Sequence, residues 1–307
     1  MILFLGTTPA VQRAMHFERV TVDDVNRATR VVVEAAGKSV NAARVAHTLG
    51  ASTVATGFLG GDSGELVRRS LDAQGVRHDF VTVAPATRVC VTVVDRQQNQ
   101  VTELVEEHAA VAPGDYAALL DRVKHHAGTC DVGLLSGSLP PGAPVDFYAR
   151  CMELARSARW VVDASGEPLR HALSLRPFVV KPNARELSDT VGLPVDTDDE
   201  LRGAIRKLLA SGPTWAVVTR GARPVVVSDG AVFFQIIPPH VESVSPIGAG
   251  DAFAGALATA LFRGQPMDLA CAYATSVAAA STLRLLAGEV DLTDAARILP
   301  NVRVEPM

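Results

Sequence analysis

Residues 132–166 read VGLLSGSLPPGAPVDFYARCMELARSARWVVDASG, and this stretch decides the fold class. Val132–Leu135 and Trp160–Asp163 are short apolar runs typical of buried strands, and each is followed by a polar loop that contains glycine. The segment between them, Val145–Ala158, has the length and residue types of a helix. A strand, a helix and a second strand at this spacing predict parallel strands joined by a helical crossover.

The same alternation extends in both directions along the chain. Strands are predicted at Ile2–Leu5, Ser52–Phe58, Phe178–Val180 and Thr214–Thr219, with helices in the segments between them. We therefore expect an α/β fold, a three-layer α/β/α sandwich whose central sheet is mostly parallel. In such sheets ligands bind at the carboxyl ends of the strands, where the short polar loops of this chain gather.

Two stretches interrupt the alternation. Apolar and polar residues alternate in both stretches, which is typical of an antiparallel sheet with one solvated face. The first stretch is Val20–Val33, and the second is the strand pair Arg88–Asp95 and Gln100–Val105. We expect them to form a small β-sheet lid, fed by excursions at about residues 14–34 and 87–106 of a single domain spanning residues 1–307. The alternative is that they are extra edge strands of the main sheet.

Composition restricts the class of protein. The chain has 307 residues, is 48% hydrophobic and carries a formal net charge of −4, which suits one large α/β domain. Its Lys and Arg residues are scattered, so nothing favours nucleic acid or a membrane as a partner, and any bound anion should be small. The four cysteines have no paired spacing, and no basic segment precedes the apolar start, which favours reduced thiols and a cytoplasmic location.

The stretch with the clearest chemistry is PIGAGDAFAG, residues 246–255. Gly248, Ala249 and Gly250 bring backbone N–H groups together at the start of an apolar helix, which is a site for an anion. Asp251 would then lie beside the anion, where its carboxylate can accept the proton of an attacking hydroxyl during phosphoryl transfer. The alternative is an N-cap aspartate on an ordinary core helix.

The ordered set of loop motifs resembles the ribokinase-like (PfkB) carbohydrate kinases, and within them the branch of 1-phosphofructokinase and tagatose-6-phosphate kinase. The resemblance covers essentially the whole chain. It rests on Thr8-Pro9-Ala10, Asn26-Arg27, Gly37-Lys38 with Asn41-Ala42-Ala43-Arg44-Val45, Thr56–Gly61, Thr87-Arg88, Leu135–Gly142, Lys181-Pro182-Asn183 with Glu186-Leu187, and Gly248–Asp251.

The resemblance implies roles for the phosphoryl-transfer residues. Asp251 would be the catalytic base, with Gly248, Ala249 and Gly250 as the anion hole for the γ-phosphoryl group of ATP. Nucleotide contacts are implied for Lys181, Asn183, Glu186, Thr219 and Gly221. Asn183 and Glu186 match the motif that organises Mg²⁺, often through water, which agrees with the few direct protein ligands that Mg²⁺ takes. By spacing, Asn183 and Glu186 also fit a helix capping box, and both roles can hold together.

The resemblance further implies a bound sugar or sugar phosphate. Arg27, Arg88 and Ser138 are expected at its phosphate, because arginine offers fork-shaped donors to a dianion. Gln12, Gly37, Lys38 and Asn41 are expected near the sugar. The alternative for Arg27 and Arg88 is that they are surface arginines on β strands. An exposed edge of the lid also permits a homodimer.

The sugar half of the predicted site departs from the family pattern. Gln12 stands where an aspartate usually binds sugar hydroxyls, and Ser39 replaces a glycine. Cys90 and Thr92 stand where polar and basic residues are common. An amide cannot copy a carboxylate without changing hydrogen-bond polarity, so the substrate stays open. The candidates are fructose 1-phosphate, fructose 6-phosphate and tagatose 6-phosphate. Alternatives are an unphosphorylated sugar, a nucleoside, or a lapsed enzyme that only senses sugar.

Overall fold

The computed structural model describes all 307 residues and contains a ten-stranded sheet and a separate four-stranded sheet. The large sheet has the strand order β14-β13-β12-β11-β10-β9-β8-β1-β4-β5. Its parallel strands are β5 (Val81–Thr82), β4 (Thr53–Leu59), β1 (Ile2–Gly6), β8 (Val132–Ser136), β9 (Arg159–Asp163), β10 (Val179–Val180) and β11 (Trp215–Arg220). Its antiparallel strands are β12 (Arg223–Ser228), β13 (Phe233–Ile237) and β14 (Arg303–Pro306).

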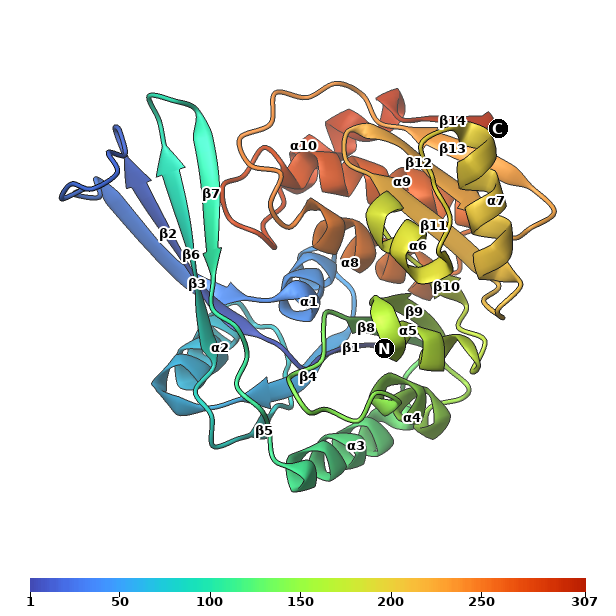
Figure 1. Cartoon of the computed structure of the whole chain (residues 1–307), viewed down its shortest axis with the longest axis horizontal. Coiled ribbons are helices and arrows are strands. Elements are labelled where there is room, and N and C mark those ends of the chain that lie inside the picture. The colour runs from blue at the N-terminus through green and yellow to red at the C-terminus, as the bar shows by residue number, and fades with distance from the viewer.

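Helices cover both faces of the large sheet (Figure 1). Ile2 and Phe4 of β1 share one core with α1 (Lys38–Thr48), α2 (Gly61–Ala73), α8 (Ala249–Phe262), α9 (Met267–Ser281) and α10 (Leu292–Ile298). Leu3 and Leu5 share the other core with α3 (Pro113–Ala127), α4 (Phe147–Leu154), α5 (Gly166–Leu173), α6 (Ala184–Val191) and α7 (Asp198–Leu209). Successive residues of a strand face opposite sides, so one strand serves both cores. The predicted three-layer α/β/α fold is confirmed.

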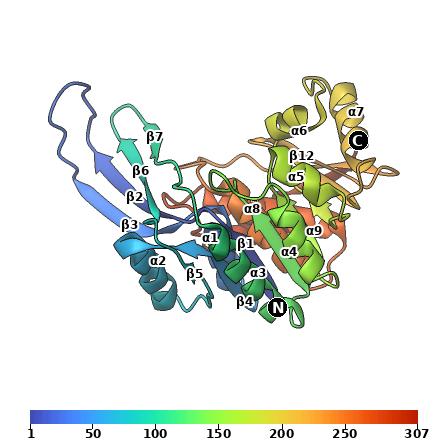
Figure 2. The same ribbon diagram turned by 60° about the horizontal axis from the view of Figure 1, so that its bottom comes forward.

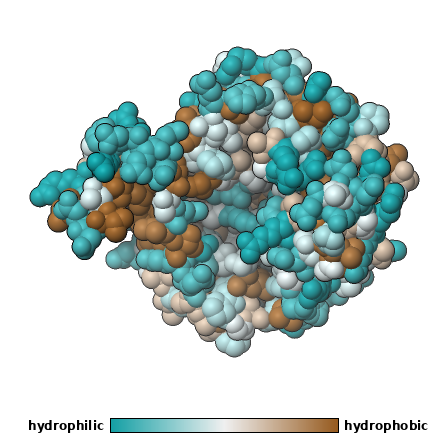
Figure 3. Space-filling model, turned by 45° about the horizontal axis from the view of Figure 1, so that its top comes forward, coloured by the Kyte–Doolittle hydropathy of each residue, from teal (hydrophilic) through white to brown (hydrophobic).

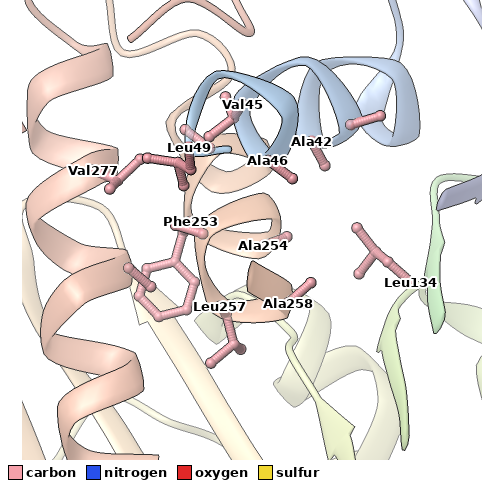
Figure 4. Packing of buried hydrophobic residues seen from close by; sticks show 14 of the residues in the cluster. Ala42, Val45, Ala46, Leu49, Leu134, Phe253, Ala254, Leu257, Ala258 and Val277 are labelled. Carbon is pink, nitrogen blue, oxygen red and sulfur yellow. The ribbon is translucent and has the colours of Figure 1, made fainter. Parts of the chain in front are cut away.

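Small side chains bring α1 and α8 together. Figure 4 shows Ala42 and Ala46 of α1 close to Ala254 of α8, with Phe253 and Leu257 filling the space toward α9. A Cβ atom added to Gly255 would lie 2.3 Å from the carbonyl oxygen of Ala42. This close approach places the start of α1 beside the start of α8, which is where the predicted site lies.

The four-stranded sheet projects from the body of the molecule (Figures 1 and 2). Its order is β3 (Arg30–Ala36), β2 (Ala10–Phe17), β6 (Arg88–Asp95) and β7 (Gln100–Val105). The prediction of a small sheet separate from the large one is confirmed. The expectation of an antiparallel sheet is corrected, because β2 and β6 pair in parallel. Each excursion is a hairpin that leaves the body on its first strand, so the two outgoing strands run the same way.

Two further details differ from expectation. Residues 18–29 form turns and bends, and the strand predicted within Val20–Val33 starts only at Arg30. The C-terminal α10 and β14 lack a strong sequence pattern and were not expected. The four cysteines are buried and unpaired with one another. None of the helices combines the length and apolar character needed to cross a bilayer.

Candidate active site

The turn before α8 is open for an anion. Gly248 has φ 79°, a left-handed conformation, and a Cβ atom there would lie 2.5 Å from the Cβ of Ala287, so only glycine fits. The N–H groups of Gly248 and Gly250 have no acceptor within the chain, whereas Ala249 N–H donates to the carbonyl of Pro246 at 3.3 Å. The turn therefore offers two free amide groups at the positive end of a helix.

Asp251 lies in the first turn of α8 and is 9% exposed. The N-cap is Gly248, and no side chain caps the helix, so the capping alternative for Asp251 is wrong. Asn41 Nδ2 donates to Asp251 Oδ2 at 2.8 Å. Burial raises the pKa of Asp251 to about 6, against the lowering effect of the Asn41 hydrogen bond. A carboxylate with this pKa is ionised at neutral pH and is still basic enough to accept a proton.

A set of charged side chains, of which Asp163 and Lys181 are buried, lies next to Asp251. Asp163, at the end of β9, pairs with Lys181 at 3.2 Å, and both side chains are almost fully buried. Lys38 Nζ lies 3.7 Å from Glu186 Oε1. The pKa of Lys38 is raised, chiefly by Asp163, so its ammonium group stays charged. Asp163 was missed in the sequence analysis, although a carboxylate that ends an apolar strand was the available signal.

The loops predicted to contact the nucleotide lie side by side at the carboxyl ends of β10 and β11. Asn183 and Thr219 form a parallel bridge, and Gly221 follows with φ 65° in an exposed turn. Asn183 Oδ1 accepts from Glu186 N at 2.8 Å, and Asn183 N donates to Glu186 Oε2 at 2.9 Å. The capping box is therefore present, and Glu186 Oε1 remains outside it, toward Lys38.

A cavity of about 290 Å³ lies between the small sheet and the starts of α1 and α8. Figure 3 shows the surface hollowed beside the small sheet. The cavity brings together seven residues that were predicted for the site: Gln12, Gly37, Lys38, Asn41, Arg88, Gly248 and Asp251. The residues predicted for the sugar therefore line the same cavity as Asp251.

The small sheet forms one wall of this cavity. Arg88 Nη2 donates to the carbonyl of Thr8 at 3.3 Å, while its buried Nε has no acceptor. Gln12 Nε2 donates to Thr92 Oγ1 at 3.1 Å, which leaves Gln12 Oε1 as an acceptor. Glu103 of β7 also lines the cavity, and its carboxylate has no hydrogen bond or ion pair within the chain. Glu103 was missed because its position depends on the pairing of Thr92 with Glu103, which the sequence alone does not reveal.

Two predicted phosphate ligands lie outside the cavity lining. Arg27 is exposed in the segment 18–29 that connects β2 and β3. Ser138 is exposed in the loop after β8, where its carbonyl accepts from Thr7 Oγ1 at 3.0 Å. Arg88 is thus the only one of the three that the structure places in the cavity.

Comparison with known proteins identifies the family of the chain. Residues 6–294 match the model of the pfkB family of carbohydrate kinases. Phosphofructokinase-2 from Escherichia coli is 27% identical, with a TM-score of 0.90 and coverage of 98% of this chain and 97% of that one.

Two more distant structures share the fold. A Thermotoga maritima protein described as a "possible 1-phosphofructokinase" is 23% identical, with a TM-score of 0.91 and coverage of 100% and 99% of the two chains. Arabidopsis thaliana ribokinase, solved with ribose and ATP, is 20% identical, with a TM-score of 0.76 and coverage of 97% of each chain. The chain belongs to the pfkB family and is a sugar kinase.

Proposed function

We propose that this kinase transfers the γ-phosphoryl group of ATP to a hydroxyl of a hexose phosphate, such as fructose 1-phosphate, fructose 6-phosphate or tagatose 6-phosphate. The observation that carries the proposal is the buried Asp251, with a pKa of about 6, next to the free amides of Gly248 and Gly250. The acceptor class is supported by Escherichia coli phosphofructokinase-2, whose structure was solved with fructose-6-phosphate.

The positions of these groups support the following reaction. The acceptor hydroxyl gives its proton to the Asp251 carboxylate as its oxygen forms a bond to the γ-phosphorus. The bond from that phosphorus to the β–γ bridging oxygen breaks, and ADP leaves. The amides of Gly248 and Gly250, together with Ala249 at the helix start, stabilise the transferring group through the helix dipole. Lys38 supplies a permanent positive charge nearby.

The nucleotide is assigned to the loops after β10 and β11, with Lys181, Asn183, Glu186, Thr219 and Gly221. The Lys181 side chain is buried against Asp163, so its charge reaches the nucleotide from beneath the loop that follows β10. No group of three Asp, Glu, His or Cys side chains is arranged so that it could hold a metal ion by itself. Asn183 and Glu186, at the start of α6, would hold a bound Mg²⁺ ion largely through water, together with the nucleotide phosphates. When bound, Mg²⁺ offsets the negative charge of the phosphates.

The acceptor is assigned to the cavity under the small sheet, which acts as the lid. Arg88 holds the phosphate, Gln12 Oε1 and Glu103 accept sugar hydroxyls, and Gly37, Lys38 and Asn41 line the opposite wall. Arg27 and Ser138 join the phosphate when the lid closes. Glu103 restores the carboxylate that Gln12 lacks, from a neighbouring part of the same sheet.

A second acceptor class is favoured by the charge of the cavity. Lys38 and Arg88 are balanced by Glu103 and Asp251, so the lining has no net charge to attract a dianion. This observation favours an unphosphorylated sugar or a nucleoside.

The experiment is ADP release from ATP and Mg²⁺ with a panel of acceptors. The panel contains fructose 1-phosphate, fructose 6-phosphate, tagatose 6-phosphate, fructose, ribose and adenosine. Turnover restricted to phosphorylated sugars supports the proposal, and turnover of fructose, ribose or adenosine alone replaces it with the second class. No ADP above the acceptor-free control with any of them refutes kinase activity on these substrates and favours a sensor.

We also propose a homodimer through the small sheet. Its face away from the cavity carries the apolar residues Met15, Val31, Val91, Val93 and Leu104, of which Val31 is 46% and Leu104 is 55% exposed. Figure 3 shows hydrophobic residues gathered on this sheet. One Escherichia coli phosphofructokinase-2 structure is of a tetrameric form.

Light scattering after size-exclusion chromatography tests the dimer. Leu104→Glu should yield a monomer, while Val232→Glu, at a residue that is 50% exposed but lies outside the small sheet, should leave the mass unchanged. A wild-type protein that elutes as a monomer at high concentration contradicts this interface.

A further inference from the structure

A second cavity, of about 640 Å³, lies at the amino ends of strands of the large sheet, on the side opposite the candidate active site. It is formed at the amino ends of β9, β10 and β11, whereas Asp163 and Lys181 mark the carboxyl ends of β9 and β10 at the active site. Its lining includes Arg156, Arg159 and Arg176 and contains no aspartate or glutamate. The charged side chains of this lining are therefore all positive.

Arg159 is held in place. Its Nη2 donates to the carbonyl of Leu261 at 2.5 Å, and its Cζ lies 5.8 Å from the ring centroid of Phe178. A guanidinium fixed by a hydrogen bond and an aromatic ring loses little freedom when it binds an anion. Its remaining N–H groups are therefore prearranged donors.

Arg176 adopts a backbone conformation that does not suit arginine. It follows α5 with φ 53°, and its N–H donates to the carbonyl of Leu173 at 3.0 Å, so it occupies a helix-terminating position that favours glycine. The other non-glycine residues with positive φ are Asp23 and Asn99, whose residue types tolerate this region. The guanidinium of Arg176 has no hydrogen bond or ion pair in the structure. A strained residue with an unpaired charge points to a role outside the fold itself.

Helix dipoles do not account for all this charge. The C-terminal ends of α4 and α5, at Leu154 and Leu173, lie beside the cavity, and each carries about half a negative charge. Together they offset about one of the three guanidinium charges. Two carboxylates offset more of the charge: Glu153 lies 3.8 Å from Arg156 on the exposed surface, and the pKa of Asp131, which is lowered chiefly by the N-terminal amine, is also lowered by Arg159. Arg176 is therefore the arginine of the cavity that has no carboxylate beside it.

We propose that this cavity binds a small phosphorylated metabolite with at least two negative charges. Arg159 and Arg176 hold the phosphate groups as fork-shaped donors, and Phe178 contacts the rest of the molecule, next to the buried Trp160. The volume falls in the range of small-molecule sites, about 300–1,000 Å³. The site does not depend on which sugar the kinase phosphorylates.

The two tryptophans of the chain, Trp160 and Trp215, supply a direct test. Trp215→Phe leaves Trp160, in the lining of this cavity, as the only reporter, and it keeps an aromatic ring against Phe234. Inorganic pyrophosphate is the probe, and AMP is titrated in parallel to distinguish an inorganic polyphosphate from a nucleotide. We expect a saturable change in Trp160 emission with at least one of them.

The decisive variant is Arg176→Gly in the Trp215→Phe background. Glycine suits φ 53°, so this variant should melt at the same or a higher temperature, yet bind the probe about tenfold or more weakly. Asn99→Gly is the matched control, because it relieves φ 51° on the small sheet and should leave binding unchanged. The proposal is overturned if neither probe changes Trp160 emission in the millimolar range, or if Arg176→Gly binds as tightly as its parent.

Discussion

Asp251→Asn should abolish catalysis and at the same time stabilise the fold. Burial raises the pKa of Asp251 from 3.8 to about 6. Ionisation of this carboxylate above pH 6 therefore lowers the free energy of unfolding of the wild-type protein. A shift of this size corresponds to about 3 kcal/mol of lost stability at pH 8. Asparagine removes the charge, keeps the shape and can still accept the hydrogen bond from Asn41.

The stability difference between Asp251→Asn and the wild type has a defined sign and a defined pH dependence. The folded pKa is raised, so the wild-type protein is stabilised by protonating Asp251 at low pH and loses that stability as the pH rises from about 4 to 6. The advantage of Asp251→Asn should therefore grow from about 1 kcal/mol at pH 4.5 to about 3 kcal/mol at pH 8. For a chain of 307 residues, 3 kcal/mol corresponds to a rise of about 5 °C in melting temperature.

Thermal melts of both proteins at pH 4.5, 6 and 8 measure this difference. Asp121→Asn is the control, because Asp121 is an exposed residue of α3 and its replacement should have little effect at any pH. A melting temperature for Asp251→Asn that equals or falls below that of the wild type at pH 8 would refute the reasoning. So would a gain in stability that is the same at all three pH values.

Three other variants test separate parts of the site. Lys38→Met removes a positive charge that lowers the pKa of Asp251. The acid limb of the pH profile of kcat/KM, expected near pH 6 in the wild type, should therefore move to higher pH. An acid limb at the same pH in both proteins would contradict this prediction. Gly248→Ala places a Cβ 2.5 Å from that of Ala287 at φ 79°, and should cost about 1–3 kcal/mol of stability and lower kcat, as denaturant melts and steady-state kinetics will show. Glu103→Gln should raise the KM for the acceptor about tenfold and leave the KM for ATP unchanged, whereas equal changes in both would argue against a sugar contact.

The fold was largely predictable because buried parallel strands are apolar throughout. Ile2–Leu5 and Val132–Leu135 were recognised almost to the residue, as were the loops that follow them. The parallel pairing of β2 with β6 was not, since alternation shows that a strand has two different faces but not which neighbour it takes. The start of β2 at Ala10 was not predicted either.

Some residues of the candidate site could be predicted from the sequence and others could not. Gly248 and Asp251 are adjacent in sequence, so their chemistry was visible before the structure. Glu103 and Asp163 come from β7 and β9, and only the packing of the sheets brings them near Asp251. Arg27 was placed at the phosphate by its motif, yet the residues around it form a loop outside the cavity lining.

The most direct test of the account is single-turnover phosphoryl transfer by the wild type and Asp251→Asn, with ATP, Mg²⁺ and the best acceptor of the panel. Nucleotide binding is measured on the same samples. The account predicts that Asp251→Asn binds ATP normally and loses at least about a hundredfold in the rate of transfer, because the acceptor hydroxyl no longer has a base. A variant that binds ATP and transfers the phosphoryl group at close to the wild-type rate would contradict the assignment of Asp251 as the base.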